Sequence, residues 1–317
     1  MTRVFLTIDA ELMWRHHVAG HDAETILRRS LDPAGVGIGW QLGRLHRHGL
    51  KAVFFVDPMP CLVYGTDWLR RLVGRILEAG QEVQLHLHPN WTGARRGDRG
   101  AAHAAFELID YSFSEQRDLL AGASDLLTAA GAPQPIAFRA GSYAASDDTL
   151  HALAALGFAY DSSHNGSEHP WPSAISLPVR QISPTRHHGL IELPVTLIED
   201  RRGNLRHFQI CALSIHEMRA ALDHAVRAGH AAVTIVSHGF ELANRAGTRP
   251  NRVHVRRFET LCRLLADRRA DLPTSHFADR PALPLGRSDL PLGPSLVRTR
   301  LRQAEQFWSN WVEERAA

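Results

Sequence analysis

The chain has 317 residues, 44% hydrophobic and 22% charged, a composition that is ordinary for a soluble globular protein with a large core. Its 36 basic and 33 acidic residues form no basic run with interleaved aromatics, so we expect no nucleic-acid partner. Three isolated cysteines predict neither a disulfide framework nor a thiolate zinc site. The sequence shows no apolar stretch that would span a bilayer and no secretory signal, so we expect a cytoplasmic protein.

In the first half of the chain, apolar runs that predict strands alternate with amphipathic stretches that predict helices. The predicted strands cover residues 4–9, 51–58, 82–89 and 135–141. The predicted helices cover residues 35–49, 67–79 and a stretch that begins at Ser112 or Ser114 and ends near Ala130. Between the first strand and the first helix, we expect a polar, irregular segment that carries Trp14, His16 and His17.

The same alternation continues in the second half of the chain. The predicted strands are 157–161, 190–197 and 231–238, and the predicted helices are 146–156, 214–228 and 253–268. Such alternation predicts an α/β fold in which crossover helices join parallel strands. The strands are apolar on both faces, which is typical of a sheet that helices cover.

Residues 272–293 are rich in proline and glycine and predict an extended segment. A final helix begins near Pro294. Its residues Leu301, Ala304, Trp308 and Trp311 recur every three or four positions and form one apolar face. We expect this helix to dock on the chain's own domain; a membrane surface or a partner is the alternative.

Two carboxylates come at the end of the first predicted strand. Asp9 and Glu11 are two positions apart, so in extended backbone their side chains point to the same side. One of them can ligate a cation while the other accepts a proton. The alternative is a helix-capping Asp9 and a solvent-facing Glu11. The carboxyl ends of parallel strands are where α/β enzymes place their sites, which favours the functional interpretation.

Two histidines come at the end of the third predicted strand. His86 and His88 share one face, while Leu85 and Leu87 point the other way into packing. Two imidazoles at this spacing can bind one divalent cation, and mixed nitrogen and oxygen ligands suit zinc or a similar metal. A single histidine on an apolar strand is usually a core residue, but a pair on one face predicts ligands.

Other strand ends carry further candidates. Arg139 can hold a carboxylate in its charged form through a bidentate pair, and Tyr143 follows it in a loop that can approach a substrate. His238 is suited to proton donation, because the pKa of histidine lies nearest physiological pH. Asp161 can orient an imidazole. Each of these residues, taken alone, also fits a structural role.

With these segments in order over residues 3–240, the sequence resembles the polysaccharide deacetylase (NodB-homology) family. The resemblance implies a distorted (β/α) barrel of about seven parallel strands. It also implies hydrolysis of the N-acetyl group of a sugar, in a polysaccharide or its precursor, with a bound divalent metal. Zinc is the expected metal, with cobalt, manganese and nickel as alternatives. Residues 1–271 would form the catalytic domain, and 272–317 an extension packed on it.

The resemblance assigns a role to each motif residue. The implied metal ligands are Glu11, His86 and His88. The implied catalytic residues are Asp9 as the base, Arg139 as the group that steadies it, Tyr143 on the oxyanion side, His238 as the general acid, and Asp161 as the residue that orients His238.

Two motifs depart from the family's commoner pattern. Ala10 separates Asp9 from Glu11, where two adjacent aspartates are usual, and Gln84 stands where the second motif usually has its first histidine. The pattern is closer to signal-less members associated with surface-polysaccharide synthesis than to secreted deacetylases. Two other functions stay open, which are hydrolysis of a non-sugar C–N bond on the same scaffold and glycan binding without catalysis.

Overall fold

The computed structural model describes residues 1–98 and 105–314, so residues 315–317 of the predicted extension lie outside it. Its main sheet is built from β1 (Arg3–Ala10), β2 (Val53–Val56), β3 (Glu82–Leu87), β4 (Ala137–Ala140), β5 (Tyr160–Asp161), β6 (Thr185–His187), β7 (Leu190–Glu192) and β10 (Ala232–His238). The strand order is β10-β1-β2-β3-β4-β5-β7-β6. Within the described residues, seven of these strands are parallel and only β6 runs antiparallel. The predicted α/β fold is therefore confirmed.

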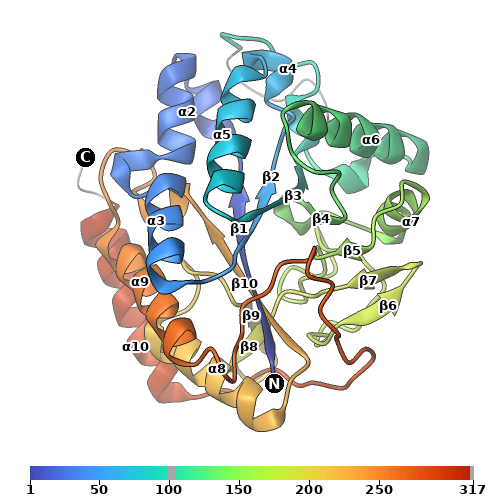
Figure 1. The fold of residues 1–317 in the computed structure, drawn as a ribbon. Helices are drawn as coiled ribbons and strands as arrows, with labels where there is room; N and C mark the ends of the chain where they lie inside the picture. Colours follow the sequence, from blue (N-terminus) through green and yellow to red (C-terminus); the bar gives the residue numbers. More distant parts are fainter. Residues whose placement is uncertain (99–104, 315–317) are drawn as a thin grey trace.

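Helices surround the sheet, which curls into a half-barrel (Figure 1). They are α1 (Trp14–Val18), α2 (Ala23–Leu31), α3 (Ile38–His48), α4 (Cys61–Tyr64), α5 (Asp67–Glu78), α6 (Phe113–Ala129), α7 (Asp147–Ala155), α8 (Ile215–Ala228), α9 (Arg252–Asp267) and α10 (Leu296–Trp308). Single-turn elements are η1 (Pro33–Gly35), η2 (Pro89–Trp91), η3 (Leu108–Asp110), η4 (Gly141–Tyr143), η5 (Phe240–Leu242) and η6 (Ser309–Glu313). No helix in residues 1–98 and 105–314 is long and apolar enough to cross a membrane.

The strands have two different faces, and the alternation of side chains along β1 shows how they are used. Leu6 and Ile8 belong to the large core under the helices, whereas Phe5 belongs to a smaller cluster inside the curl of the sheet. Phe5 packs there on Phe277, with ring centroids 4.9 Å apart. Because side chains alternate along a strand, Asp9 lies on the same inner side as Phe5. The inner side of the sheet is therefore where the polar strand-end residues meet.

The segment after β1 differs from the prediction. Instead of irregular chain, residues 14–18 and 23–31 form α1 and α2. Asp22 caps α2 by accepting a hydrogen bond from the backbone N–H of Thr25 at 2.8 Å. The helix buries Ile26. Asp22 at the N-cap satisfies a backbone donor that would otherwise lack a partner. The polar composition of the segment hid this helix start from the sequence prediction.

The predicted strand 190–197 is divided in two. β7 ends at Glu192, and β8 (Leu197–Arg201) begins after Pro194 and pairs with β9 (Asn204–His207) in a separate hairpin. Proline lacks the N–H that a continued strand would use in its ladder, so the strand is interrupted there.

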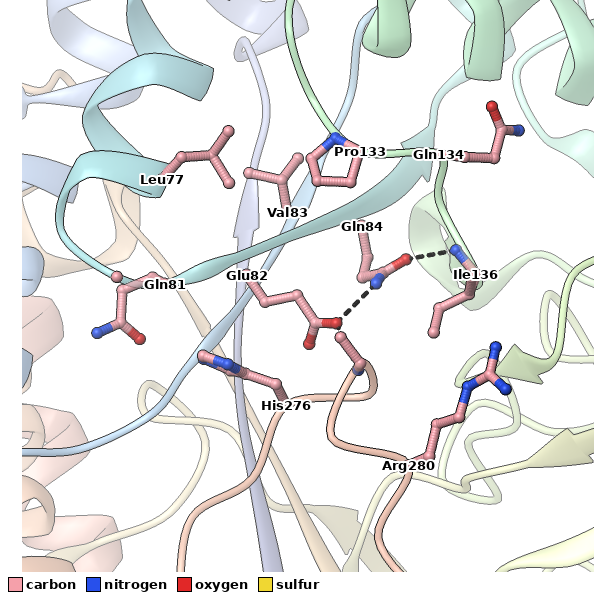
Figure 2. A pocket seen from close by; sticks show the side chains of 12 residues that line it. Leu77, Gln81, Glu82, Val83, Gln84, Pro133, Gln134, Ile136, His276 and Arg280 are labelled. Carbon is pink, nitrogen blue, oxygen red and sulfur yellow. Dashed lines mark hydrogen bonds between the residues drawn. The ribbon is translucent and has the colours of Figure 1, made fainter.

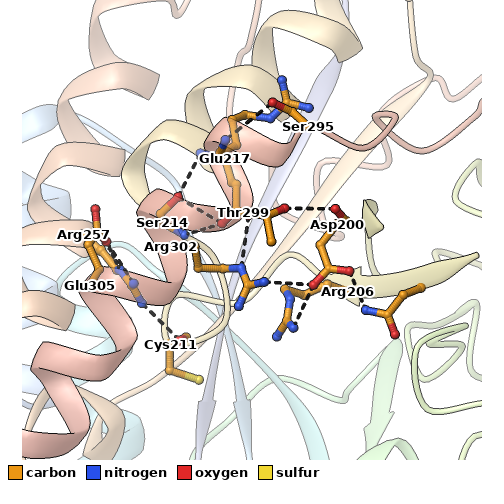
Figure 3. A network of polar contacts seen from close by, with 12 residues as sticks. Asp200, Arg206, Cys211, Ser214, Glu217, Arg257, Ser295, Thr299, Arg302 and Glu305 are labelled. Carbon is orange, nitrogen blue, oxygen red and sulfur yellow. Dashed lines mark hydrogen bonds and ion pairs between the residues drawn. The ribbon is translucent and has the colours of Figure 1, made fainter. Parts of the chain in front are cut away.

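The C-terminal helix α10 lies on the domain, but the expectation that its apolar face makes the contact is wrong. Thr299 and Arg302 are buried, whereas Leu301, Trp308 and Trp311 are exposed. The helix lies over α8 and β8, where buried carboxylates accept hydrogen bonds from Arg302 (Figure 3). Pairing of these buried charges, rather than burial of apolar surface, decides which face of α10 turns inward.

Candidate metal centre and active site

Side chains from four strands converge at the carboxyl ends of the strands in the main sheet. They surround a cavity of about 210 Å³, which is lined by Asp9, Glu11, His86, His88, Ala140, Ser142, Tyr143 and His238. The strands β10, β1, β2, β3 and β4 are neighbours in the sheet, so their ends lie at one edge. The convergence that was expected from the sequence is thus present for these strands, and Asp161 is the predicted site residue that lies elsewhere.

Glu11, His86 and His88 form a compact group of potential metal ligands. One ligand atom from each lies within 4.8 Å of the other two. Glu11 Oε2 is 3.4 Å from His86 Nε2 and also contacts His88 Nε2 directly. Two imidazoles and one carboxylate, converging from a strand and a strand end, are the donor set that catalytic zinc sites use.

The tautomer of His86 leaves its Nε2 able to bind a metal ion. Its Nδ1 lies 2.7 Å from the backbone carbonyl oxygen of Arg139. A carbonyl can only accept, so Nδ1 carries the hydrogen and the lone pair of the neutral ring is on Nε2, the nitrogen that faces Glu11. Such a hydrogen bond to the far nitrogen commonly orients a metal-binding histidine. The residues present therefore fit a divalent cation.

Electrostatics hold Glu11 and His88 together as an ion pair. Burial raises the pKa of Glu11, but the charge of His88 outweighs it and lowers that pKa well below its usual value. Burial opposes the charge of His88, yet Glu11 raises its pKa to about 9. A cation between these groups would replace the proton on His88, because a ligating imidazole must be neutral.

The loop after β4 presses against His88. Gly141 opens this loop, and a Cβ added there would lie 2.7 Å from Cγ of His88 and closer still to two other ring atoms. Only glycine lets the backbone approach the imidazole this closely. The close contact with His88, a potential metal ligand, thus explains why glycine stands at position 141.

Asp9 is the buried carboxylate of the site, and Arg139 holds it. Arg139 Nη1 donates to Asp9 Oδ1 at 2.8 Å and to Thr7 Oγ1 at 2.7 Å. The predicted bidentate pair is wrong, because Nε and Nη2 of Arg139 donate instead to the carbonyl and the hydroxyl of Ser162. The guanidinium also lies over the ring of Phe55. The second carboxylate oxygen of Asp9, Oδ2, is left to face the cavity.

His238 ends β10 and faces Oδ2 of Asp9, the carboxylate oxygen that Arg139 does not hold. Its Nε2 is 3.6 Å from Asp9 Oδ2, and its Nδ1 is 3.6 Å from Glu241 Oε2. Gln209 donates to the same oxygen of Glu241 at 2.9 Å. Burial works against a charged imidazole, but Glu241 and Asp9 raise the pKa of His238 to about 9. At neutral pH, His238 therefore carries a proton that it can donate.

The structure does not bring Asp161 to His238, so the expectation that it orients this residue is not supported by its position. Asp161 accepts hydrogen bonds from the backbone N–H and the hydroxyl of Ser163, at 2.9 and 2.8 Å. It also pairs with Glu192, whose pKa burial and the charge of Asp161 raise well above its usual value. Asp161 orders the segment whose Ser162 anchors Arg139, and Glu241 takes the place that was expected for it.

Tyr143 lines the cavity from η4. Its backbone has a φ of 60°, and that of Ser142 before it has a φ of 53°, an uncommon conformation for residues with side chains. Its hydroxyl is buried and has no hydrogen-bond partner in residues 1–98 and 105–314. Burial raises its pKa well above the usual value. The strained turn points this residue into the cavity, where a ligand would supply the partner.

Two further residues of the site were missed from the sequence. Glu241 follows His238 by three positions, and η5 turns its side chain back to the imidazole and its backbone N–H. Asp57 directly follows β2 and lies beside the potential ligands, and in the described chain its Oδ2 has no hydrogen-bond partner. Burial raises its pKa to about 6, against the charges of His88 and His86. The signal that could have identified Asp57 is an aspartate at the end of an apolar strand, directly before a proline.

Another cavity lies at the amino ends of the strands (Figure 2). It measures about 540 Å³ and is lined by polar residues of β3 and by the extended C-terminal segment. There Glu82 accepts hydrogen bonds from the backbone N–H groups of Phe277 and Ala278. Gln84, which stands where the family usually has a histidine, accepts from Ile136 and donates to Glu82. These residues join strands and segments, which is a structural role.

A second group of potential ligands lies at the edge of the sheet. His187 Nε2 and His188 Nε2 are 3.4 and 3.3 Å from the two carboxylate oxygens of Asp147. This group lies outside the cavity of Asp9 and His238. It offers a matched control for experiments on the first group.

No protein-family model matches the sequence, and no curated protein matches it. A Mycobacterium smegmatis protein assigned as a polysaccharide deacetylase is 18% identical, with a TM-score of 0.58 over 91% of this chain and 95% of that chain. A Pseudomonas aeruginosa PAO1 protein with the same assignment is 12% identical, with a TM-score of 0.52 over 88% and 89%. The 4-α-glucanotransferase of Thermococcus litoralis is 8% identical, with a TM-score of 0.50 over 88% of this chain and 40% of that chain.

At these identities the likeness concerns the fold. The chain has the (β/α)-barrel fold of the polysaccharide deacetylases, so the fold that the resemblance implies is confirmed. The glucanotransferase shows that a related fold also carries another reaction. Function therefore has to be argued from the site.

Proposed function

We propose that the protein is a metal-dependent deacetylase that hydrolyses the N-acetyl group of a sugar, in a polysaccharide or its precursor. The observation that carries the proposal is one cavity that combines a cation-binding group with a base and a proton donor. Glu11, His86 and His88 form the first, and Asp9 and His238 are the other two. The fold supports the proposal, because proteins assigned as polysaccharide deacetylases share it.

The ligand group is suited to zinc, with cobalt, manganese and nickel as alternatives. A divalent cation held by Glu11, His86 and His88 would polarise the amide carbonyl and acidify the attacking water. The carbonyl of Arg139 keeps His86 in the tautomer that can bind it.

The protein's own groups move the protons. Asp9 accepts a proton from the attacking water, while Arg139 keeps its carboxylate aimed into the cavity. The backbone N–H of Tyr143 would donate to the oxyanion as the carbonyl carbon becomes tetrahedral. His238 then protonates the amine nitrogen as the C–N bond breaks, so acetate and a free amine leave. Glu241 supports this role by keeping His238 charged until it donates.

Aromatic side chains beside the ligands favour a sugar as the substrate. A hollow of about 140 Å³ adjoins the site and shares Glu11 and His88 with it. Its walls include the partly buried Trp14 and the exposed Phe106, and the buried Trp91 supports Trp14 from behind, with ring centroids 4.9 Å apart in a T-shaped arrangement. Rigid aromatic faces suit the apolar face of a sugar ring.

The test measures acetate released from N-acetylated oligosaccharides by the zinc-loaded protein, with small cyclic amides as the competing substrates. Asp9→Asn should keep bound zinc, because an amide oxygen still accepts from Arg139, but should lose about 10²–10⁴-fold in turnover. His88→Gln should lose zinc, and His187→Gln, in the second ligand group, should keep both zinc at the site and turnover. If only the small amides are cleaved, the protein is a hydrolase of non-sugar C–N bonds and the proposed sugar substrate is wrong. If zinc binds but no substrate is hydrolysed, the deacetylase proposal is wrong and glycan binding without catalysis becomes the favoured function.

A further inference from the structure

Helix α10 and the turn η6 expose an apolar surface. Of the fourteen large hydrophobic side chains that are exposed in the described residues, seven lie between positions 296 and 312. They are Leu296, Val297, Leu301, Phe307, Trp308, Trp311 and Val312. We call these seven residues the C-terminal apolar face. Isolated exposed hydrophobic residues are normal, but a contiguous set of this size marks a surface that binds something.

The C-terminal apolar face is held outward by the polar contacts on the other side of the helix (Figure 3). Arg302 donates to Asp200 at 2.9 Å and to Glu217 at 3.1 Å, and the side chains of both carboxylates are 1% exposed. Arg257 pairs with Glu305 at 2.9 Å. Turning the helix to bury its apolar side would take Arg302 away from both buried carboxylates, and among the described residues Glu217 would keep only its hydrogen bonds from Ser214. The outward direction is therefore built into the fold.

The surface next to the C-terminal apolar face is basic. The segment 245–252 is tied to the end of η6, because Arg245 N donates to Glu314 at 2.7 Å and Asn251 Nδ2 donates to Ser309 at 2.8 Å. Arg245 and Arg252 are exposed there, as is Arg300 on α10 itself. In the described parts of segments 245–256 and 296–314, every carboxylate is at least partly buried. The carboxylates present turn toward the protein.

We propose that the C-terminal apolar face docks on the surface of an anionic lipid bilayer. Phenylalanine, tryptophan and leucine beside arginine is the combination that interfacial helices use, with apolar side chains in the headgroup region and arginines on lipid phosphates. A second copy of the chain suits this surface less well, because it would set the exposed arginines against their own counterparts. The charge of the surface thus favours lipid phosphate over self-association.

The docking surface lies beside the catalytic cavity. A hollow of about 280 Å³ is lined by Arg245 and Glu314 together with Phe240 and Glu241. Glu241 is the carboxylate that faces His238. Docking would hold the rim of the site close to the bilayer. The proposal itself does not depend on the reaction that the site performs.

The experiment measures flotation of the purified full chain with two kinds of vesicle. One is phosphatidylcholine alone, and the other contains one third phosphatidylglycerol. The wild-type chain should float with the anionic vesicles, less so at high salt. Replacing Phe307, Trp308 and Trp311 together by serine should weaken this binding by at least about tenfold. Trp171→Ser, which changes a tryptophan that is 64% exposed in another part of the chain, is the matched control and should bind as wild type does.

Charge and self-association are tested with the same chain. Arg252→Glu and Arg300→Glu should each weaken binding to anionic vesicles by about fivefold or more. Wild-type protein that fails to float with anionic vesicles overturns the proposal. So does a triple serine variant that floats like wild type. A wild-type dimer that the triple variant converts to a monomer, without vesicle binding by either, assigns the surface to a second copy and also overturns it.

Discussion

Replacement of Gly141 by alanine tests whether the loop after β4 positions His88. The new methyl carbon would lie 2.7 Å from Cγ of His88, and ordinary contacts of this kind begin at 3.4 Å. Either the imidazole or the loop must therefore shift by about 0.7 Å or more. Gly141 does not have a positive φ, so the backbone itself accepts alanine, and the contact alone carries the effect.

A shift of this size matters because His88 is a proposed ligand. Displacements near 1 Å in a catalytic site cost roughly 10²-fold in rate. Loss of a group that supports a metal ligand weakens metal binding by about 10–100-fold. We expect Gly141→Ala to lower kcat about 100-fold and to raise the zinc concentration that gives half-maximal activity. Zinc titration of the activity, with elemental analysis of the purified variant, measures both.

Gly122→Ala is the matched control. Gly122 lies in α6, and a Cβ there meets nothing within 4 Å. Alanine should stabilise the helix by up to about 1 kcal/mol and leave zinc binding and turnover unchanged. Stoichiometric zinc and wild-type turnover in Gly141→Ala would refute the idea that this glycine places His88.

Three other predictions concern the proton donor and the C-terminal helix. The value of kcat/KM should fall as pH rises through about 9, because His238 donates its proton only below its raised pKa. Glu241→Gln removes a charge that raises the pKa of His238, so this fall in kcat/KM should move to lower pH. Asp161→Asn should leave the pH of that fall unchanged, since Asp161 contacts other groups; a shift equal to that of Glu241→Gln would contradict this assignment. Arg302→Met should lower the free energy of unfolding by about 3–5 kcal/mol in urea denaturation, because the buried Glu217 loses its cationic partner and Asp200 keeps only Arg206 and Asn204; a loss under about 1 kcal/mol would argue against the network in Figure 3.

Local periodicity was enough to place the site residues on the sheet. Alternation along β3 puts His86 on the inner face and Leu85 and Leu87 under the helices, and the structure has this arrangement. The same reasoning failed between residues 14 and 31, where a cap at Asp22 and a short apolar face form helices in a segment that looks irregular. Short helices give too few periodic positions for such a pattern to be recognised.

The sequence by itself determined that Asp9, His86 and His238 lie at strand ends, because the apolar runs mark where the strands stop and the period of a strand fixes the face on which a side chain lies. It did not determine which of those side chains touch. That His238 faces Glu241 rather than Asp161, and that Arg139 divides its donors between Asp9 and Ser162, follow from how distant segments pack. The orientation of α10 likewise depends on buried carboxylates far from it in sequence. Such pairings depend on the burial of charge in the folded state, which no local pattern records.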